Sequence, residues 1–513
     1  MQPERPSKKE KGERKKFKIT RRALPFSLFL ILAGCGPSRA PSVLPAKRFQ
    51  GVTVNVACPG EPAASVVQRY SQIWASQTGA QVKVFPHDPA AEPGPGPAAD
   101  LWVLSPAQMP HWANSGRLWQ VPVELVEHDR NYAWQNILPL YRYKLCIWDQ
   151  KVYALPLLGD ALLCFYREDL LQDAGHRDAF RKKYGRELTA PVTWEQFTEL
   201  AEYFDNGKRP GIDHTCPSLP PLPDNLDELD RLFYSVAVSF ARQAVREDDP
   251  KPPPSVEIFS FHYDLETGAV RIDTPGFVHA LQLLQRLQAF RPAHAMHDPP
   301  TAFQKGEAIL CLASPAWIKR FQDSAMVRDK FGVCAVPGSG HVFDYTTGQK
   351  RLAASVNWVP YLGAGGWMLA VPRSNAEPEA AFALATALSG PKTSQDIVIE
   401  PAWGGGVYRR EHLEGGVGWH QLGLERKRTE RLVDIMREAV LHRRVTNPVL
   451  RLRTPDERAY QQALNAELRA ALFEGKDAGR ALQAAADRWR QMDERKDAKS
   501  RLAEYRLSLS LSR

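Results

Sequence analysis

The sequence predicts an α/β fold that contains a mainly parallel sheet and at least two core-forming units. Two short runs with alternating apolar residues, at 51–60 and 80–86, flank a segment with helical spacing at 61–79. An apolar run at 101–104 then leads into a second helical segment that ends at Gly116. This order favours parallel pairing, and such sheets bind ligands beyond the carboxyl ends of their strands. More than one core is expected because a chain of 513 residues exceeds what one hydrophobic core usually supports.

The first 34 residues have the three regions of an export signal. A positively charged start is followed by a short apolar run from 23 to 33, which ends in small residues. The run is far shorter than the roughly 20 apolar residues that a membrane-spanning helix needs. We therefore expect residues 1–34 to be a signal peptide. Arg21 and Arg22 resemble a degenerate twin-arginine signal, but this pair leaves the export route open.

The signal ends in the sequence LAGC at residues 32–35, which resembles the lipobox of bacterial lipoproteins. The resemblance implies that Cys35 begins the mature chain and carries lipid, so that residues 35–50 form a tether to the membrane. The alternative is an ordinary signal peptide with an incidental cysteine. A lipoprotein of this kind is expected in the periplasm or at the cell surface.

The charge of the chain argues against a nucleic-acid partner. The formal net charge is +9 for the whole chain. Residues 1–34 contain ten Lys and Arg and three Glu, a net +7, so the mature chain carries +9 minus +7, or +2. A chain this close to neutral lacks the positive field that binds a polyanion.

Helix starts and amphipathic periodicity mark the remaining elements. Thr193, with Gln196 three residues later, forms the capping pattern of a helix start. Thr274 and Pro275 mark another start, ahead of apolar residues with helical spacing. Three amphipathic helices are expected in the C-terminal third, each with one apolar face that suits docking on a lobe. Residues 490–513 are expected to form a charged tail.

Four blocks of the sequence carry a resemblance to a known family. Residues 151–175 with 191–197 are similar to a crossover between two lobes, and residues 303–320 are similar to a segment that leads to a binding-site tryptophan. Residues 365–390 and 460–489 provide the third and fourth blocks. In this order they resemble the extracellular solute-binding proteins that serve ABC importers, in particular the sugar-binding family that includes maltodextrin-binding protein.

This resemblance implies a two-lobed periplasmic-binding-protein type II fold with a hinge and a central ligand cleft. Lobe one would comprise residues 51–157 and 337–400, and lobe two would comprise residues 159–335 and 401–489. A hinge allows an empty open state and a liganded closed state that differ by contacts made only in the second. The implied partners are a small-molecule solute and the permease and ATPase subunits of an ABC transporter, and the receptor itself is expected to be a monomer.

Sugar receptors combine aromatic platforms with fixed polar groups, and three tryptophans are candidates for the platforms. Trp317 stands where the family places a stacking tryptophan. Trp367 begins an expected strand beside glycines that allow close approach, and Trp403 precedes three glycines. Core packing is the alternative for each of them.

Three polar residues are candidates for hydrogen bonds to the ligand. Asp160 follows the expected crossover, and its alternative role is that of a turn or cap carboxylate. Glu61 follows the first strand in a loop that faces the cleft in this family, or else it compensates a helix dipole. Gln108 follows the third expected strand in a similar way.

The sequence offers no chemistry for catalysis or for a metal. It contains no motif for hydrolysis, zinc proteolysis or nucleotide binding, so neither a catalytic residue nor a cofactor is expected. His294 and His297 have the spacing of two metal ligands, but they lack a third, and no metal site is expected. Six cysteines follow Cys35 without a CxxC pair, which favours buried free thiols and leaves disulfide pairing open.

The sequence therefore predicts a lipid-anchored receptor that binds a mono- or oligosaccharide, delivers it to an ABC transporter and catalyses no reaction. Three alternatives stay open. The same fold could bind a polyamine, an organic acid or a phosphodiester. The receptor could instead feed a membrane sensor, or the chain could be a cell-surface carbohydrate-active enzyme.

Overall fold

The computed structural model describes residues 47–86, 98–205, 217–246, 249, 252–292, 297–414, 417–441 and 448–511. The expected signal peptide, Cys35 and most of the expected tether lie outside these residues, as do Cys216 and His294. Within the described residues, no helix is both long enough and apolar enough to cross a membrane.

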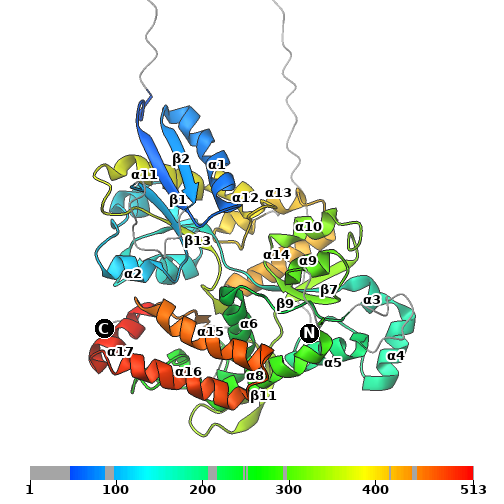
Figure 1. Ribbon diagram of the computed structural model, residues 1–513. Coiled ribbons are helices and arrows are strands. Elements are labelled where there is room, and N and C mark those ends of the chain that lie inside the picture. Colours follow the sequence, from blue (N-terminus) through cyan, green and yellow to red (C-terminus); the bar gives the residue numbers. More distant parts are fainter. Residues whose placement is uncertain are drawn as a thin grey trace, which may run out of the picture. The chain divides into compact units, whose positions relative to one another are not determined.

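A five-stranded sheet forms the centre of the first lobe (Figure 1). Its strands lie in the order β2 (Gln81–Pro86), β1 (Thr53–Cys58), β3 (Leu101–Leu104), β13 (Trp367–Ala370) and β6 (Leu155–Leu158). β1 is parallel to β2 and β3, whereas β13 is antiparallel to β3 and β6. The predicted parallel start of the fold is confirmed, and β1 and β3 end at the same edge of the sheet.

The helix α1 (Ala63–Thr78) connects β1 to β2 and ends where the sequence predicts. Gly79 caps it in the left-handed conformation, with φ of 81°, and its N–H donates to the Ala75 carbonyl. α1 contacts α11 (Pro378–Ser389) and α12 (Pro391–Val398), and both of these helices contact β6.

A three-stranded antiparallel sheet lies in the second lobe, in the order β8 (Leu310–Ala313), β7 (Leu163–Arg167) and β9 (Phe331–Ala335). Successive side chains of a strand point to opposite faces of its sheet. Phe165 of β7 accordingly belongs to the buried apolar cluster that also contains the first sheet, and Tyr166 belongs to a second cluster. β7 therefore joins the two hydrophobic cores.

Four helices pack together around the second cluster. They are α6 (Leu226–Ala241), α8 (Pro275–Leu287), α15 (Glu457–Phe473) and α16 (Ala478–Asp493). Figure 1 shows α15 and α16 running side by side in orange and red. Near the three-stranded sheet, α9 (Pro299–Gln304) contacts β8 and α10 (Trp317–Asp323), and α14 (Arg426–Leu441) contacts β9.

A hairpin of β10 (Ser339–Phe343) and β11 (Lys350–Asn357) lies in a stretch that the sequence assigns to lobe one. In the structure it packs against α6 and α8, and the Asn357 side-chain amide donates to the Arg242 carbonyl at 2.8 Å. We therefore propose that the second lobe includes this hairpin, and that the chain returns to the first lobe after residue 362 instead of at Pro337.

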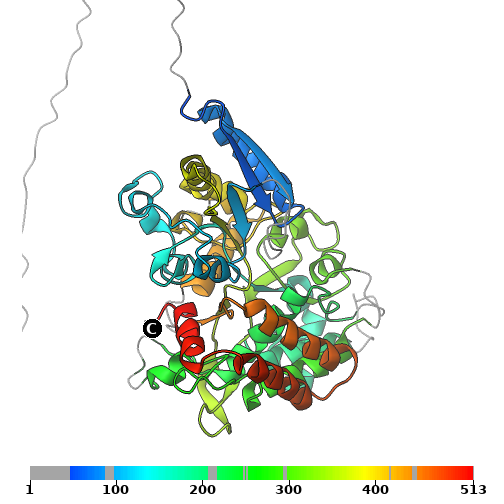
Figure 2. The same cartoon turned by 60° about the vertical axis from the view of Figure 1, so that its left-hand side comes forward.

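The segment expected to be a charged tail is folded. α16 continues to Asp493, and α17 (Ala498–Ser508) follows it. Tyr505 and Leu507 of this helix are buried, although the helix also contains several charged residues. Figure 2 shows α17, in red, close to the first lobe, and the Lys144 ammonium donates to the Leu509 carbonyl at 2.8 Å.

The remaining elements are short. Two further pairs of strands are β4 (Ile147–Trp148) with β5 (Lys151–Val152) and β12 (Tyr361–Leu362) with β14 (Val449–Leu450). The other α-helices are α2 (Met109–Asn114), α3 (Glu168–Gln172), α4 (Ala174–Tyr184), α5 (Trp194–Asp205), α7 (Ser255–Phe259) and α13 (Val417–His420). Single helical turns occur at Glu124–His128, Trp134–Asn136, Tyr141–Leu145, Gln288–Phe290 and Arg410–His412.

Candidate ligand cleft

A cleft of about 1310 Å³ opens between the edge of the first sheet and the helices α6 and α15. The loops that follow β1 and β3 supply one wall, and the starts of α6 and α15 supply residues from the second lobe. The crossover from β6 to β7 also lines it. The cleft thus lies beyond the carboxyl ends of the parallel strands, where open α/β sheets bind their ligands.

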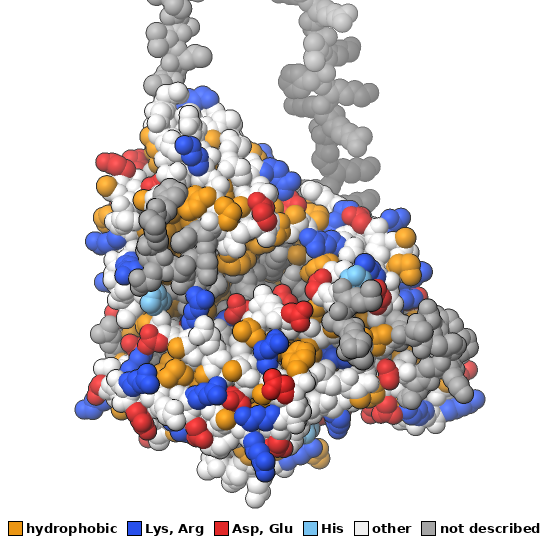
Figure 3. All heavy atoms as spheres, viewed as in Figure 1, with side chains coloured by type: hydrophobic (Ala, Val, Ile, Leu, Met, Phe, Trp, Pro, Cys, Tyr) orange, Lys and Arg blue, Asp and Glu red, His pale blue; other side chains and the backbone are white. Residues whose placement is uncertain are grey.

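Charged side chains of both signs line the cleft. They include Glu61, Glu228 and Glu457 among the acids and Arg231 and Arg458 among the bases. Acidic and basic side chains are also interspersed over the face of the molecule that Figure 3 shows. Since neither sign dominates, this lining does not create the one-sided field that would attract a polyvalent ion.

Five of the six residues predicted to bind ligand line this cleft: Glu61, Gln108, Asp160, Trp367 and Trp403. The sixth, Trp317, lies at the start of α10 and lines a smaller cavity instead. Its ring stacks on Phe321 with centroids 5.8 Å apart, and the Arg320 guanidinium lies 4.6 Å from its ring centroid.

Trp367 and Trp403 form an aromatic corner of the cleft. Their ring centroids are 5.9 Å apart with an interplanar angle of 39°, and both side chains are half-buried. Gly366, which precedes Trp367, has φ of +85°, and a Cβ there would lie 2.6 Å from the Leu158 carbonyl oxygen. Glycine thus lets the backbone pass close to the crossover, and the tryptophan that follows it faces the cleft.

Asp160 is almost fully buried, and other parts of the protein occupy both of its carboxylate oxygens. One oxygen forms an ion pair with the Arg231 guanidinium, and the other accepts from the Ala364 N–H at 3.1 Å. Its own N–H donates to the Tyr141 hydroxyl at 2.8 Å. These contacts favour the alternative that the sequence left open, in which Asp160 holds the turn of the crossover, and they leave Arg231 at the cleft surface.

Glu61 and Gln108 lie on the loops that follow β1 and β3, and each side chain accepts a hydrogen bond from a backbone N–H close by in the sequence. The Glu61 carboxylate accepts from the Ser65 N–H at 3.3 Å, at the start of α1. The Gln108 side-chain oxygen accepts from the Ser105 N–H at 2.9 Å. Both residues therefore stabilise these loops and still line the cleft.

Two segments of the chain cross at the cleft, each with a glycine at the point of contact. Gly159 and Gly406 exchange backbone hydrogen bonds of 2.9 and 2.8 Å. A Cβ on Gly159 would lie 2.3 Å from the Val407 carbonyl oxygen, and one on Gly406 would lie 2.6 Å from the Asp160 carbonyl carbon. Backbones that approach this closely require glycine, so the crossover can have no larger residue at these two positions.

Comparison with known proteins assigns the family of this chain. Residues 87–406, more than half of the 513 residues, match the family described as bacterial extracellular solute-binding protein. The chain belongs to this family. No curated protein sequence matches the chain significantly.

Solved structures of solute-binding proteins have the same fold. The maltose-bound MalE3 protein of T. maritima is 18% identical, with a TM-score of 0.60, and the match covers 86% of this chain and 100% of that one. The GacH receptor of Streptomyces glaucescens, solved without ligand and with acarbose, is 17% identical, with a TM-score of 0.60 and coverage of 87% and 99%. A ribitol complex from Agrobacterium radiobacter K84 has a TM-score of 0.65 at 16% identity, with coverage of 87% and 100%.

A polar wall of this solute-binding protein was not predicted from the sequence. Glu457, Gln461 and Asn465 of α15 line the cleft, together with Arg451, which follows β14. The three α15 residues are four positions apart and so share one face of the helix. This spacing beside the apolar positions of the amphipathic helix was the available signal. No local sequence pattern identifies Arg451 as a residue of the cleft.

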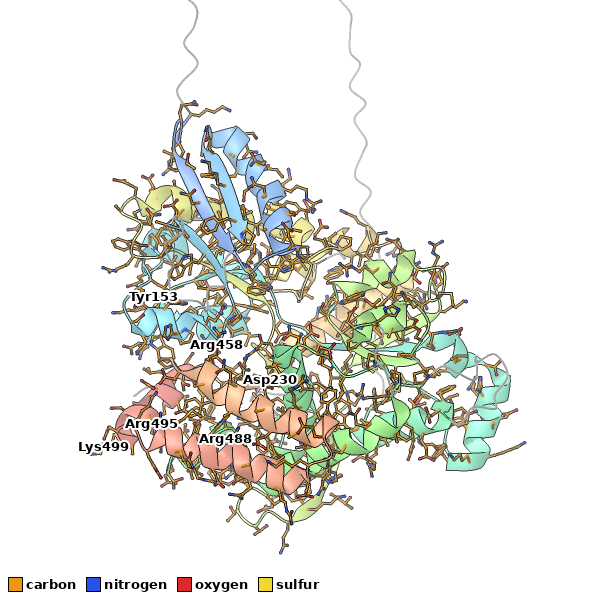
Figure 4. The ribbon with its side chains drawn as sticks, viewed as in Figure 1. Tyr153, Asp230, Arg458, Arg488, Arg495 and Lys499 are labelled. Carbon is orange, nitrogen blue, oxygen red and sulfur yellow. The ribbon has the colours of Figure 1, made fainter. Side chains whose placement is uncertain are left out.

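Arg451 lies near two carboxylates of α6, of which Asp230 is buried and Asp227 is exposed. Its guanidinium lies 3.0 Å from an Asp227 oxygen and 3.8 Å from an Asp230 oxygen, and it donates to Gln461. Figure 4 shows Asp230 on α6 beside α15. Burial raises the pKa of Asp230 to about 6 and that of Glu457 to about 7, although the charge of Arg451 opposes both shifts.

The raised pKa of Asp230 predicts a pH-dependent stability. Between about pH 4 and pH 6 the folded chain holds a proton on Asp230 that the unfolded chain has lost, so this group's contribution to the free energy of unfolding falls as the pH rises. We expect the wild type to lose about 2–3 kcal/mol over this range relative to Asp230→Asn. Denaturant unfolding of both proteins at pH 4, 5, 6 and 7 measures the difference, and parallel profiles would contradict the prediction.

The described residues offer no arrangement for a metal ion. Among them, no group of three or more His, Cys, Asp or Glu side chains could hold one. His297 contacts Lys305 and lies 3.5 Å from a Glu307 oxygen. The cysteines that the structure describes are free thiols: Cys58, Cys146, Cys164, Cys311 and Cys334.

Proposed function

We propose that this solute-binding protein is an extracytoplasmic receptor that binds a sugar in the cleft and delivers it to an ABC transporter. The observation that carries the proposal is the pair Trp367 and Trp403, whose half-buried rings line a cleft that also contains side-chain amides. Sugar rings have flat apolar faces edged by hydroxyls, which suit aromatic surfaces flanked by fixed polar groups. The structural neighbours solved with maltose, acarbose and ribitol support this choice.

The size of the cleft supports a ligand larger than one sugar ring. Its volume of about 1310 Å³ exceeds the roughly 300–1,000 Å³ of most small-molecule sites. Gln461, Asn465 and Glu457 of α15 line the same cleft as the two tryptophans and can exchange hydrogen bonds with hydroxyls. An oligosaccharide that touched both walls would favour closure, because it would make contacts that the open state lacks.

Closure at the hinge would allow a transporter to recognise the liganded receptor. The crossovers at 158–161 and 404–407 contain one and three glycines and lie between the lobes, so they are the segments in which we expect backbone angles to change on closure. A transporter can distinguish the closed receptor from the open one by the surface that closure creates. We propose that lipid on Cys35 keeps the receptor at the membrane, in the periplasm or at the cell surface, that it acts as a monomer and that it catalyses no reaction.

Thermal unfolding with a panel of solutes tests the proposal. The panel contains sugars, polyamines, amino acids, organic acids and phosphodiesters. A sugar at about a hundred times its dissociation constant should add roughly 2.7 kcal/mol to the free energy of unfolding, and the melting temperature should rise. A rise in melting temperature with a charged solute alone would still identify a solute receptor, but it would contradict the proposal that the solute is a sugar. An unchanged melting temperature with every solute of the panel would contradict the proposal that the protein is a solute receptor.

A further inference from the structure

A second cavity adjoins the ligand cleft. It has a volume of about 170 Å³, and three residues, Glu228, Arg231 and Ser314, line both spaces. More than half of its lining residues are leucine or proline. Trp194 and Trp317 add two indole rings to its walls.

The size and lining of this cavity suit an apolar ring. An engineered apolar cavity of about 150 Å³ stays dry and binds benzene. The cavity here is of the same size class, and most of its lining side chains are aliphatic or aromatic, with Glu228, Arg231, Arg291 and Ser314 as the polar ones. A sugar ring has hydroxyls around its edge, and most of this lining would leave them without partners.

Two hydrogen-bond donors on the lining side chains lack a partner. Trp194 is 1% exposed, and its indole N–H meets no acceptor among the described residues. The Arg291 Nε–H is also buried without a described acceptor, while another nitrogen of the same guanidinium donates to the Pro221 carbonyl at 3.2 Å. Unpaired buried donors are costly, and both side chains line the cavity, so a ligand whose acceptor oxygen reached either N–H would bind at an advantage.

We infer that this cavity is a subsite for an aromatic ring with an oxygen substituent, and that the receptor takes sugar conjugates of the aryl glycoside class. The sugar part would occupy the cleft, and the aryl group would pass Arg231 and Ser314 into the cavity. The assignment of the sugar part rests on the proposed function. The assignment of the ring rests on the second cavity alone.

Phenol is the probe for the ring subsite, since it needs no knowledge of the sugar. Saturation-transfer NMR of phenol should show binding to the full chain. Leu232→Trp and the milder Leu312→Phe enlarge side chains that line only the second cavity of the two, and each should weaken phenol binding at least tenfold. Leu352→Trp, at a position that is 87% exposed, is the matched control and should bind phenol as the wild type does.

A second measurement connects the ring to the sugar. For the sugar that gives the largest melting shift, the phenyl glycoside should bind at least tenfold more tightly than the methyl glycoside in calorimetry. The filling variants should lose this advantage and keep the affinity for the methyl glycoside.

The outcomes separate this inference from the proposed function. No phenol signal with the wild type, or an equal signal with both filling variants, would overturn the ring subsite, even where plain sugars still raise the melting temperature. Phenol binding without a change of melting temperature with any sugar would support the ring subsite and contradict the proposal that the protein is a sugar receptor.

Discussion

Replacing Arg453 by methionine is expected to lower the free energy of unfolding by about 3–5 kcal/mol. Arg453 is fully buried, and its guanidinium donates to backbone carbonyls of the first lobe. The acceptors are Leu145 at 2.8 Å, Lys144 at 2.8 Å and Pro106 at 3.1 Å. A weaker contact of 3.4 Å reaches the Ser508 carbonyl at the end of α17. Methionine fills much of the volume but donates nothing, so these buried carbonyls lose their partner.

The control for this prediction is Arg480→Met on the exposed surface of α16. The same chemical change there should alter the free energy of unfolding by less than about 0.5 kcal/mol. Denaturant unfolding at pH 7 compares both variants with the wild type. A loss in Arg453→Met no larger than that in Arg480→Met would show that Arg453 does not hold these segments together.

Removal of both cleft tryptophans should weaken sugar binding by about 100- to 1000-fold, or roughly 3–4 kcal/mol. In Trp367→Ala with Trp403→Ala, the cleft loses the aromatic surface on which a sugar face would lie, while the amides of α15 remain. Calorimetric titration with the sugar that gives the largest melting shift measures the change. Trp119→Ala, in the first lobe but outside the cleft, is the control and should bind as the wild type does. Equal affinities in the double variant and in Trp119→Ala would exclude this pair from the binding site.

Local signals were enough to predict several elements of the fold. Alternating apolar residues predicted β1, and Gly79 marked the end of α1. The capping pattern at the start of α5 is also present, since the Gln196 N–H donates to the Thr193 hydroxyl at 3.3 Å. These signals act over a few residues, so the sequence displays them directly.

The differences arose where distant residues decide the structure. The β10–β11 hairpin, which the sequence assigned to lobe one, packs on α6 through contacts such as that of Asn357 with the backbone of α6 and of the turn after it. α17 looked like a charged tail because its buried residues, Tyr505 and Leu507, are too few to give an amphipathic pattern. Such contacts join residues more than 100 positions apart, which periodicity and turn chemistry cannot display.

In the candidate site, too, local sequence order explains some positions, whereas contacts between distant residues determine others. Glu61 and Gln108 line the cleft because they follow β1 and β3, neighbouring parallel strands whose ends meet at one edge of the sheet. Their role in ligand binding stays a prediction. The sequence could not show that Arg231 pairs with Asp160, since the partners lie 71 residues apart. Trp317 lines the second cavity instead of the cleft, and its ring stacks on Phe321, four residues later in α10.

Native mass spectrometry of the chain after incubation with a mixture of saccharides shows whether the cleft holds a sugar. We expect a complex of one chain with one intact saccharide, which is lost in the double variant of Trp367 and Trp403 and retained in Trp119→Ala. A chain that emerges without any saccharide would contradict the claim that the cleft is a sugar site. Recovery of shortened saccharides in place of intact ones would contradict the claim that the protein binds its solute without chemistry.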